Sequence, residues 1–153
     1  MLIESRPCSD PELVALVTAQ QRELREANRP VGVGAVDDSF PAPDDVRHLV
    51  GVVNGRAVAC GAIQSIDPDI AEIRRMYVRP AHRRRGVGRQ LLAALEDLAF
   101  WAGHSVLRLE TGTYLPSALA LYRSSGYTEI PVYGRYVGNP YSACFEKRIL
   151  VAA

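Results

Sequence analysis

The sequence predicts an α/β protein with a mixed, mostly antiparallel central sheet and helices on both faces. Three strand-like segments follow one another between residues 47 and 78, separated by turn signals. An amphipathic helix comes next, and a strand–helix–strand pattern completes the chain. Hairpin-linked strands followed by such units favour a mixed α/β sandwich over an all-parallel Rossmann sheet.

The first predicted helix follows a short apolar stretch at residues 2–3. Ser9 or Asp10 is a suitable cap, and a proline follows at the first turn. Apolar residues then recur on one side over residues 11–28. Residues 29–45 contain several prolines and glycines, so we expect a loop there.

The three strands of the predicted meander span residues 48–53, 57–66 and 70–78. The pair Asn54-Gly55 is a strong hairpin signal between the first two. Asp67-Pro68-Asp69 predicts the second turn. Consecutive strands joined in this way pair antiparallel.

The second half of the chain predicts two helices and two strands. The helices span about residues 88–103 and 116–125, and Gly126 closes the second one. Alternating apolar residues predict strands at 105–109 and 144–150. We expect residues 1–153 to form a single domain, because this length suits one hydrophobic core.

Composition excludes several function classes. The 18 Lys+Arg against 17 Asp+Glu give a net charge of +1, so no overall field favours nucleic acid or an acidic membrane. Cys8, Cys60 and Cys144 share no disulfide or metal-ligand spacing, which predicts no metal and fits a reducing cytosol. No apolar run approaches the ~18 residues of a membrane span. We therefore expect a soluble, cytoplasmic protein.

The segment Arg83-Arg84-Arg85-Gly86-Val87-Gly88-Arg89 predicts an anion site. It lies between a strand and a helix, where the first backbone N–H groups of the helix have no intrahelical partner. Gly86 and Gly88 let a phosphate approach the backbone. A Rossmann fingerprint would need glycine in place of Leu91, and a Walker A loop would need Gly-Lys-Ser/Thr. The alternative is a solvated charge run before a capped helix.

This segment resembles the Arg/Gln-x-x-Gly-x-Gly/Ala signature of the GNAT superfamily of N-acetyltransferases. A second block, Ala118 to Tyr122 with Gly126-Tyr127, is similar to the family's Ala-x-x-Leu-Tyr-x-x-x-Gly-Phe/Tyr element. The two motifs stand in the family's order, and the resemblance spans about residues 47–150. It implies a GNAT-like fold and direct acetyl transfer from acetyl-CoA to a primary amine.

The resemblance also implies how acetyl-CoA binds. Backbone N–H groups from about Arg85 to Arg89 would hold the pyrophosphate, and Met76 and Val78 would hydrogen-bond the pantetheine arm. The third meander strand and the next strand would splay apart to admit the thioester, and an N–H near Val78 would face its oxygen. The implied cofactor-binding residues are Met76, Tyr77, Val78, Arg83, Arg84, Arg85, Gly86, Val87, Gly88 and Arg89.

Acetyl transfer needs a base for the amine and an acid for the departing thiolate. Glu72 resembles in position the general-base glutamate of the histone-acetyltransferase branch, and the alternative is that it only pairs with Arg74 or a cross-strand partner. Tyr122 matches the tyrosine that protonates the coenzyme A sulfur in many relatives. The alternative is a packing tyrosine whose hydroxyl contacts the cofactor.

Three further residues are candidates for acceptor binding. Glu110 lies near the expected gap and could orient the amine. Tyr133 and Tyr136, with Arg135, could cover a small polar acceptor, or these aromatics could only seal the sheet edge. Many relatives carry Asn where this chain has Leu115, so a contact often made there is in doubt.

Two other function classes remain as alternatives. A non-catalytic acyl-CoA-binding module would keep the glycine turn without using Glu72 or Tyr122 for chemistry. A nucleic-acid patch at residues 79–89 is disfavoured because no aromatic residue is interleaved. The acceptor could be a small amine or a peptide, no membrane or nucleic-acid partner is expected, and a homodimer is common in the family.

Overall fold

The computed structural model describes residues 1–28 and 45–149. Within them seven strands form one sheet in the order β1-β2-β3-β4-β5-β7-β6. Only β4 and β5 pair in parallel, which confirms the mixed, mostly antiparallel sheet. The strands are β1 Leu2–Arg6, β2 Val46–Val53, β3 Arg56–Ser65, β4 Ile70–Val78, β5 Val106–Gly112, β6 Thr128–Ile130 and β7 Ser142–Arg148.

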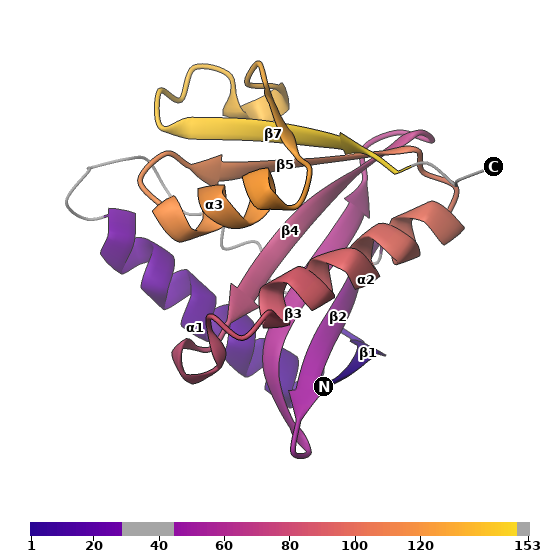
Figure 1. Cartoon of the computed structure of the whole chain (residues 1–153), viewed down its shortest axis with the longest axis vertical. Coiled ribbons are helices and arrows are strands. Elements are labelled where there is room, and N and C mark those ends of the chain that lie inside the picture. Colours follow the sequence, from indigo (N-terminus) through magenta and orange to yellow (C-terminus); the bar gives the residue numbers. More distant parts are fainter. Residues whose placement is uncertain (29–44, 150–153) are drawn as a thin grey trace.

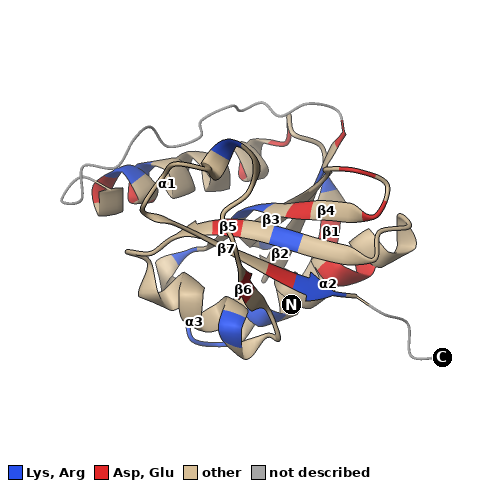
Figure 2. Ribbon diagram, turned by 90° about the horizontal axis from the view of Figure 1, so that it is seen from above, with Lys and Arg blue, Asp and Glu red and all other residues tan. Residues whose placement is uncertain are grey.

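Helices cover both faces of the sheet, as the sequence predicts. The helix α1 (Pro11–Asn28) packs on one face, and α2 (Val87–Trp101) and α3 (Pro116–Ser124) pack on the other (Figure 1). Each face has its own apolar cluster, the larger one under α2 and α3. Charged residues of both signs occur along α1, as Figure 2 shows. None of the helices among the described residues is long and apolar enough to cross a membrane.

Local signals place the first helix and the two turns of the meander. Asp10 caps α1, because its Oδ2 accepts the Leu13 N–H at 3.0 Å. Asn54 and Gly55 have φ angles of 51° and 77°, the left-handed pair of a type I′ hairpin. Asp67 Oδ1 accepts two backbone N–H groups, each at 2.8 Å. Both predicted turns are confirmed.

Some boundaries differ from the predictions. The strand predicted at 105–109 runs to Gly112, and the last strand begins at Ser142 and not at Cys144. The three-residue β6 was not predicted, because it is too short to show alternation and is held by its pairing with β7. The predicted loop at 29–45 lies outside the described residues, apart from Asp45.

The strand β4 changes partners along its length. Its first three residues pair with β5, at Ile70–Glu72 against Val106–Arg108. Beyond them the two arrowheads point apart (Figure 1), so the predicted splaying is present. Near the middle of β4, Arg75 has a φ of 60°, and the register with β3 shifts at this bulge. The bulge frees backbone groups of β4 for other partners.

One polar cluster ties the last strands to the helices. Lys147, the only lysine of the chain, donates to both carboxylate oxygens of Glu96 at 3.0 and 3.2 Å and to the Ser125 carbonyl at 2.9 Å. The Tyr127 hydroxyl also donates to Glu96, at 2.9 Å. The cluster fixes β7 against α2 and the segment after α3.

Candidate active site

The polar residues of β4, β5 and β7 share one face of the sheet. Side chains alternate along a strand, and Ala71, Ile73, Leu107 and Leu109 belong to the apolar cluster under α2. Their neighbours therefore face the side of α1. These neighbours are Glu72, Arg74, Arg108 and Glu110, and Ser142 joins them from β7.

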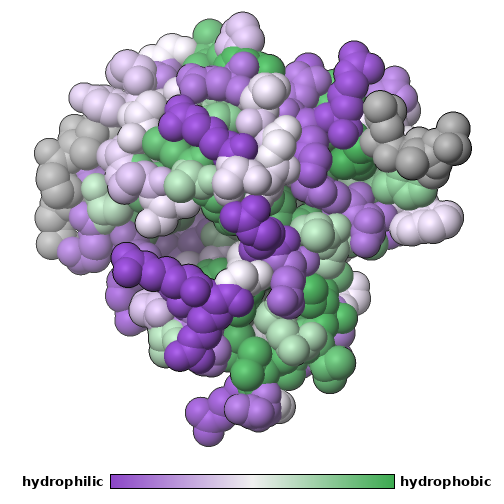
Figure 3. Space-filling model, in the orientation of Figure 1, coloured by the Kyte–Doolittle hydropathy of each residue, from purple (hydrophilic) through white to green (hydrophobic). Residues whose placement is uncertain are grey.

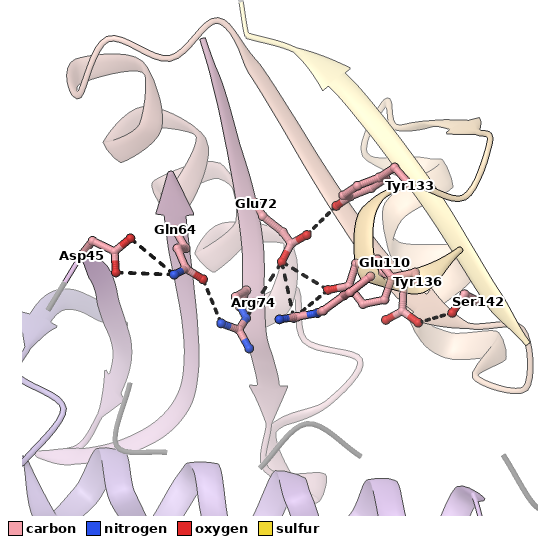
Figure 4. A network of polar contacts seen from close by, with 9 residues as sticks. Asp45, Gln64, Glu72, Arg74, Glu110, Tyr133, Tyr136 and Ser142 are labelled. Carbon is pink, nitrogen blue, oxygen red and sulfur yellow. Dashed lines mark hydrogen bonds and ion pairs between the residues drawn. The ribbon is translucent and has the colours of Figure 1, made fainter. Parts of the chain in front are cut away.

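Glu72 is the centre of a hydrogen-bond network (Figure 4). Its side chain is only 10% exposed, and the hydroxyls of Tyr133 and Tyr136 donate to its two oxygens at 2.6 and 3.2 Å. Arg74 Nε and Arg135 Nη2 lie 4.0 and 3.9 Å from Oε1. The ion pair between Glu72 and Arg74 is therefore present. Glu72 also accepts hydrogen bonds from two tyrosines that lie more than 60 residues further along the chain.

Both tyrosines stay protonated at neutral pH and so remain hydrogen-bond donors. Burial, with the Glu72 carboxylate, raises the pKa of Tyr133 well above its ordinary value and that of Tyr136 to about 12. An arginine guanidinium also stacks over each ring. That of Arg108 lies 5.4 Å from the centroid of the Tyr133 ring, and that of Arg135 lies 5.0 Å from the centroid of the Tyr136 ring. These contacts hold the 131–141 segment over the polar face.

Glu110 lies on β5 just beyond the residues that pair with β4. Its Oε2 accepts the Ser142 hydroxyl at 2.7 Å. Burial raises the pKa of this carboxyl, and the charge of Glu72 adds to the rise. A carboxylate whose pKa moves towards neutrality is a better proton acceptor at physiological pH.

Tyr122 lies on α3, in the apolar cluster on the opposite face of the sheet. Its side chain is buried, and its ring packs against Tyr127 at 5.9 Å and Phe145 at 6.5 Å. Burial raises the pKa of its hydroxyl, and the nearby charge of Glu110 raises it further. The hydroxyl therefore keeps its proton at neutral pH, which is the form that a general acid requires.

The carbonyls freed by the β4 bulge have side-chain partners that the sequence analysis missed. Gln20 Nε2 on α1 donates to the Met76 carbonyl at 3.0 Å, and Cys60 Sγ donates to the Arg75 carbonyl at 3.2 Å. Gln20 follows Leu16 by four residues and belongs to the buried stripe of α1. A polar residue in an apolar stripe is a signal that could have identified it. We see no such signal in the sequence for Arg108 or Ser142.

The turn before α2 presents open backbone donors. Arg84 and Gly86 have φ angles of 63° and 78°, and no side chain caps the first turn of the helix. A Cβ built on Gly86 would meet nothing within 4 Å. Figure 3 shows the surface hollowed between this turn and α3. The uncapped N–H groups and the open space fit an anion such as a pyrophosphate.

Two of the arginines in this segment contact the protein itself. Arg83 Nε donates to the Val78 carbonyl at 2.8 Å, and Nη2 pairs with Glu23 of α1 at 2.8 Å. Arg89 donates to the Ser124 hydroxyl at 3.0 Å and to its carbonyl at 3.3 Å. Arg83 thus ties the end of β4 to α1, and Arg89 ties α2 to α3.

The sequence from residue 13 to 127 matches the family model described as the acetyltransferase (GNAT) family. The chain belongs to the GNAT acetyltransferases. It is 43% identical over 108 residues to the IAA acetyltransferase of Azospirillum brasilense, a match that covers 69% of this chain and 70% of that protein. It is 32% identical over 133 residues to the N-alpha-acetyltransferase RimI of Mycobacterium tuberculosis, which covers 80% and 81% of the two chains.

A solved structure supports the same family and fold. A candidate acyl-CoA N-acyltransferase from Klebsiella pneumoniae superposes with a TM-score of 0.83 at 33% identity, over 97% of each chain. This GNAT enzyme therefore carries out acetyl-CoA-dependent acetyl transfer, as its two motifs imply. The fold brings Glu72, Tyr133 and Tyr136 into contact, and it places Glu110 near both Glu72 and Tyr122.

Proposed function

We propose that this acetyltransferase moves the acetyl group directly to the nitrogen of a primary amine bound on the α1 side of the gap between β4 and β5. The proposal rests on the splaying of β4 and β5. On one side of the gap lie the open N–H groups at the start of α2, and on the other lie Glu72 and Glu110. Donor and acceptor would meet between them without a covalent enzyme intermediate.

The backbone would bind the acetyl donor. N–H groups of residues 85–89 would hold the pyrophosphate, as the family motif implies, and residues 76–78 would hold the pantetheine. Arg79 N donates to the Val58 carbonyl on β3, so alternation points the Val78 N–H the other way, towards the gap. Arg83 already donates to the Val78 carbonyl, which leaves the N–H for the ligand. We propose it as the donor to the thioester oxygen.

Two carboxylates are candidates for the base that takes the amine proton. Glu72 is the base predicted from sequence, and both of its oxygens accept phenolic hydrogen bonds. Glu110 is a second candidate, because Ser142 donates to its Oε2 and burial raises its pKa. Tyr122 would protonate the coenzyme A thiolate, since its own hydroxyl stays neutral at physiological pH.

Coenzyme A release, measured with a thiol reagent against a panel of amines, amino acids and peptides, tests the proposal. E72Q and E110Q separate the two carboxylates. The variant that lacks the base should have a kcat/KM lower by about 10²- to 10⁴-fold. Its pH profile should also no longer fall at acid pH as that of the wild type does. Tyr122→Phe should lower kcat without changing acetyl-CoA binding. Acetyl-CoA binding with no release for any acceptor would favour the non-catalytic binding module.

Three wider expectations belong to this proposal. Residues 1–153 form one catalytic domain, the enzyme works in the cytoplasm on a small amine or peptide, and two copies associate as a homodimer. Limited proteolysis, cell fractionation and light scattering test these points in turn.

A further inference from the structure

Arg135 is the exposed cation beside the proposed acceptor site. Its side chain is 54% exposed, and its Nη2 lies 3.9 Å from Glu72 Oε1 and donates to the Tyr136 hydroxyl at 2.9 Å. Arg74, the other arginine near Glu72, is only 9% exposed and donates to Gln64. Arg108 is 29% exposed and pairs with Glu146. Arg135 is therefore the member of this group that a ligand can reach most easily.

A simple amine meets an electrostatic difficulty at this place. Before it loses its proton, the acceptor carries a positive charge, and its natural partner is the Glu72 carboxylate. Arg135 pairs with the same carboxylate at 3.9 Å, so the two cations would lie side by side. Their repulsion is strong in a half-buried site. An acceptor that brings its own negative charge removes this difficulty, because that charge pairs with Arg135.

We propose that the acceptor is a zwitterion of the α-amino-acid type, with Arg135 binding its carboxylate while Glu72 and the tyrosine hydroxyls face its amino group. The proposal rests on the acetyl-transfer function proposed above. A guanidinium suits this role because its planar fork binds a carboxylate through two parallel hydrogen bonds. A peptide N-terminus is disfavoured, since the neighbouring group is then a neutral amide.

Two glycines give the segment that carries Arg135 a backbone that can change conformation. Gly134 and Gly138 flank the region with φ angles of 56° and 93°, and a Cβ at either would meet nothing within 4 Å. Tyr133 and Tyr136 anchor the segment on Glu72. Arg135 can thus exchange its contact with Glu72 for a contact with the acceptor while the tyrosines stay in place.

The test compares matched acceptors that differ only in the carboxylate. Free amino acids, their carboxamides and short peptides with the same first residue are assayed with the wild-type enzyme and with R135Q and R135K. We expect kcat/KM for the free acid to exceed that for the carboxamide by about tenfold or more, through KM. R135Q should abolish this preference and R135K should keep part of it, with the KM for acetyl-CoA unchanged in both.

Arg123→Gln is the matched control, because it removes an exposed arginine paired with Glu129 on the outside of α3 and should keep the preference. Wild-type turnover of carboxamides or peptides as efficient as that of free acids overturns the zwitterion inference and leaves the proposed acetyl transfer standing. A preference that survives in R135Q also overturns it. Absence of turnover with every acceptor overturns the proposed function, and the inference falls with it.

Discussion

Leu109 and Glu110 are neighbours on β5, yet they belong to two different faces of the sheet. Leu109 is 1% exposed and packs in the apolar cluster under α2 and α3. Glu110 faces the side of α1, where it accepts a hydrogen bond from Ser142. The same strand therefore contributes to stability through one residue and, by our proposal, to chemistry through the next. The two faces should respond differently to substitution.

The largest effect is expected at Glu110. Glu110→Gln should lower kcat/KM by about 10²- to 10⁴-fold if this carboxylate is the base. Its folded-state pKa is raised, so the half-buried carboxylate costs stability that builds up as the pH rises from the ordinary pKa of a glutamate to the folded-state pKa, and the cost is absent below the ordinary pKa. E110Q should therefore be more stable than wild type at pH 7.5, by roughly 0.5–2 kcal/mol, and not at pH 4.

Thermal unfolding at both pH values, with kinetics across pH, checks this prediction, and Glu129→Gln on the exposed surface is its control. A lower melting temperature for E110Q at pH 7.5 would show that Glu110 is a structural residue.

The opposite behaviour is expected one residue earlier. Leu109→Ala removes a fully buried side chain and should lower the free energy of unfolding by about 2–5 kcal/mol. The kcat of the protein that remains folded should fall far less than in E110Q, since Leu109 shares the apolar cluster with Tyr122 but supplies no acid or base. Urea unfolding with activity measured well below the transition tests both parts. A large loss of kcat at unchanged stability would break the distinction between the faces.

A smaller effect on stability should distinguish the two tyrosines that donate hydrogen bonds to Glu72. Tyr133→Phe removes the shorter hydrogen bond, 2.6 Å against 3.2 Å for Tyr136, and hydrogen bonds to charged groups contribute about 1.5–3 kcal/mol. We expect Y133F to lower the urea midpoint more than Y136F. The reverse order would mean that Tyr136 holds the segment, through its additional contact with Arg135.

The smallest effect concerns the turn before α2, where we expect the backbone to bind the pyrophosphate. Gly86→Ala puts a side chain at a φ of 78° and should cost about 1 kcal/mol of stability, with a higher KM for acetyl-CoA. Gly55→Ala in the β2–β3 hairpin is the matched control, because Gly55 has a similar φ of 77° and a Cβ there would also meet nothing within 4 Å. Equal KM values for G86A and G55A would argue against the turn as the pyrophosphate site.

The sequence predicted the elements of the fold more completely than the contacts of the site. Alternation and turn chemistry identified the meander, and the helical spacing of leucines identified α2, because these signals lie within a few residues of one another. The hydrogen bonds from Tyr133 and Tyr136 to Glu72 join residues 61 and 64 apart. No local pattern encodes such a pairing, so Glu72 was singled out only by its family position.

The short strand β6 and the bulge at Arg75 also escaped prediction. β6 exists because β7 lies beside it, and a positive φ at an arginine follows from the packing of β3 against β4. Both are consequences of tertiary structure. Glu110 was placed near the gap from sequence, yet only the fold could show that it is half-buried and bonded to Ser142.

Because this chain has a single lysine, few of its own amines can react with acetyl-CoA in an assay. An acetyl thioester reacts slowly with any deprotonated amine, and Lys147 holds its ammonium against three acceptor oxygens. The enzyme therefore offers the donor it binds almost no ε-amine of its own to modify. A mass increase of one acetyl group would point to the amino terminus or to Lys147, and peptide mapping would separate the two. A labelled acetyl group lost from the donor could then be attributed to the acceptor, as an amide, or to hydrolysis, as acetate, with little background from the enzyme.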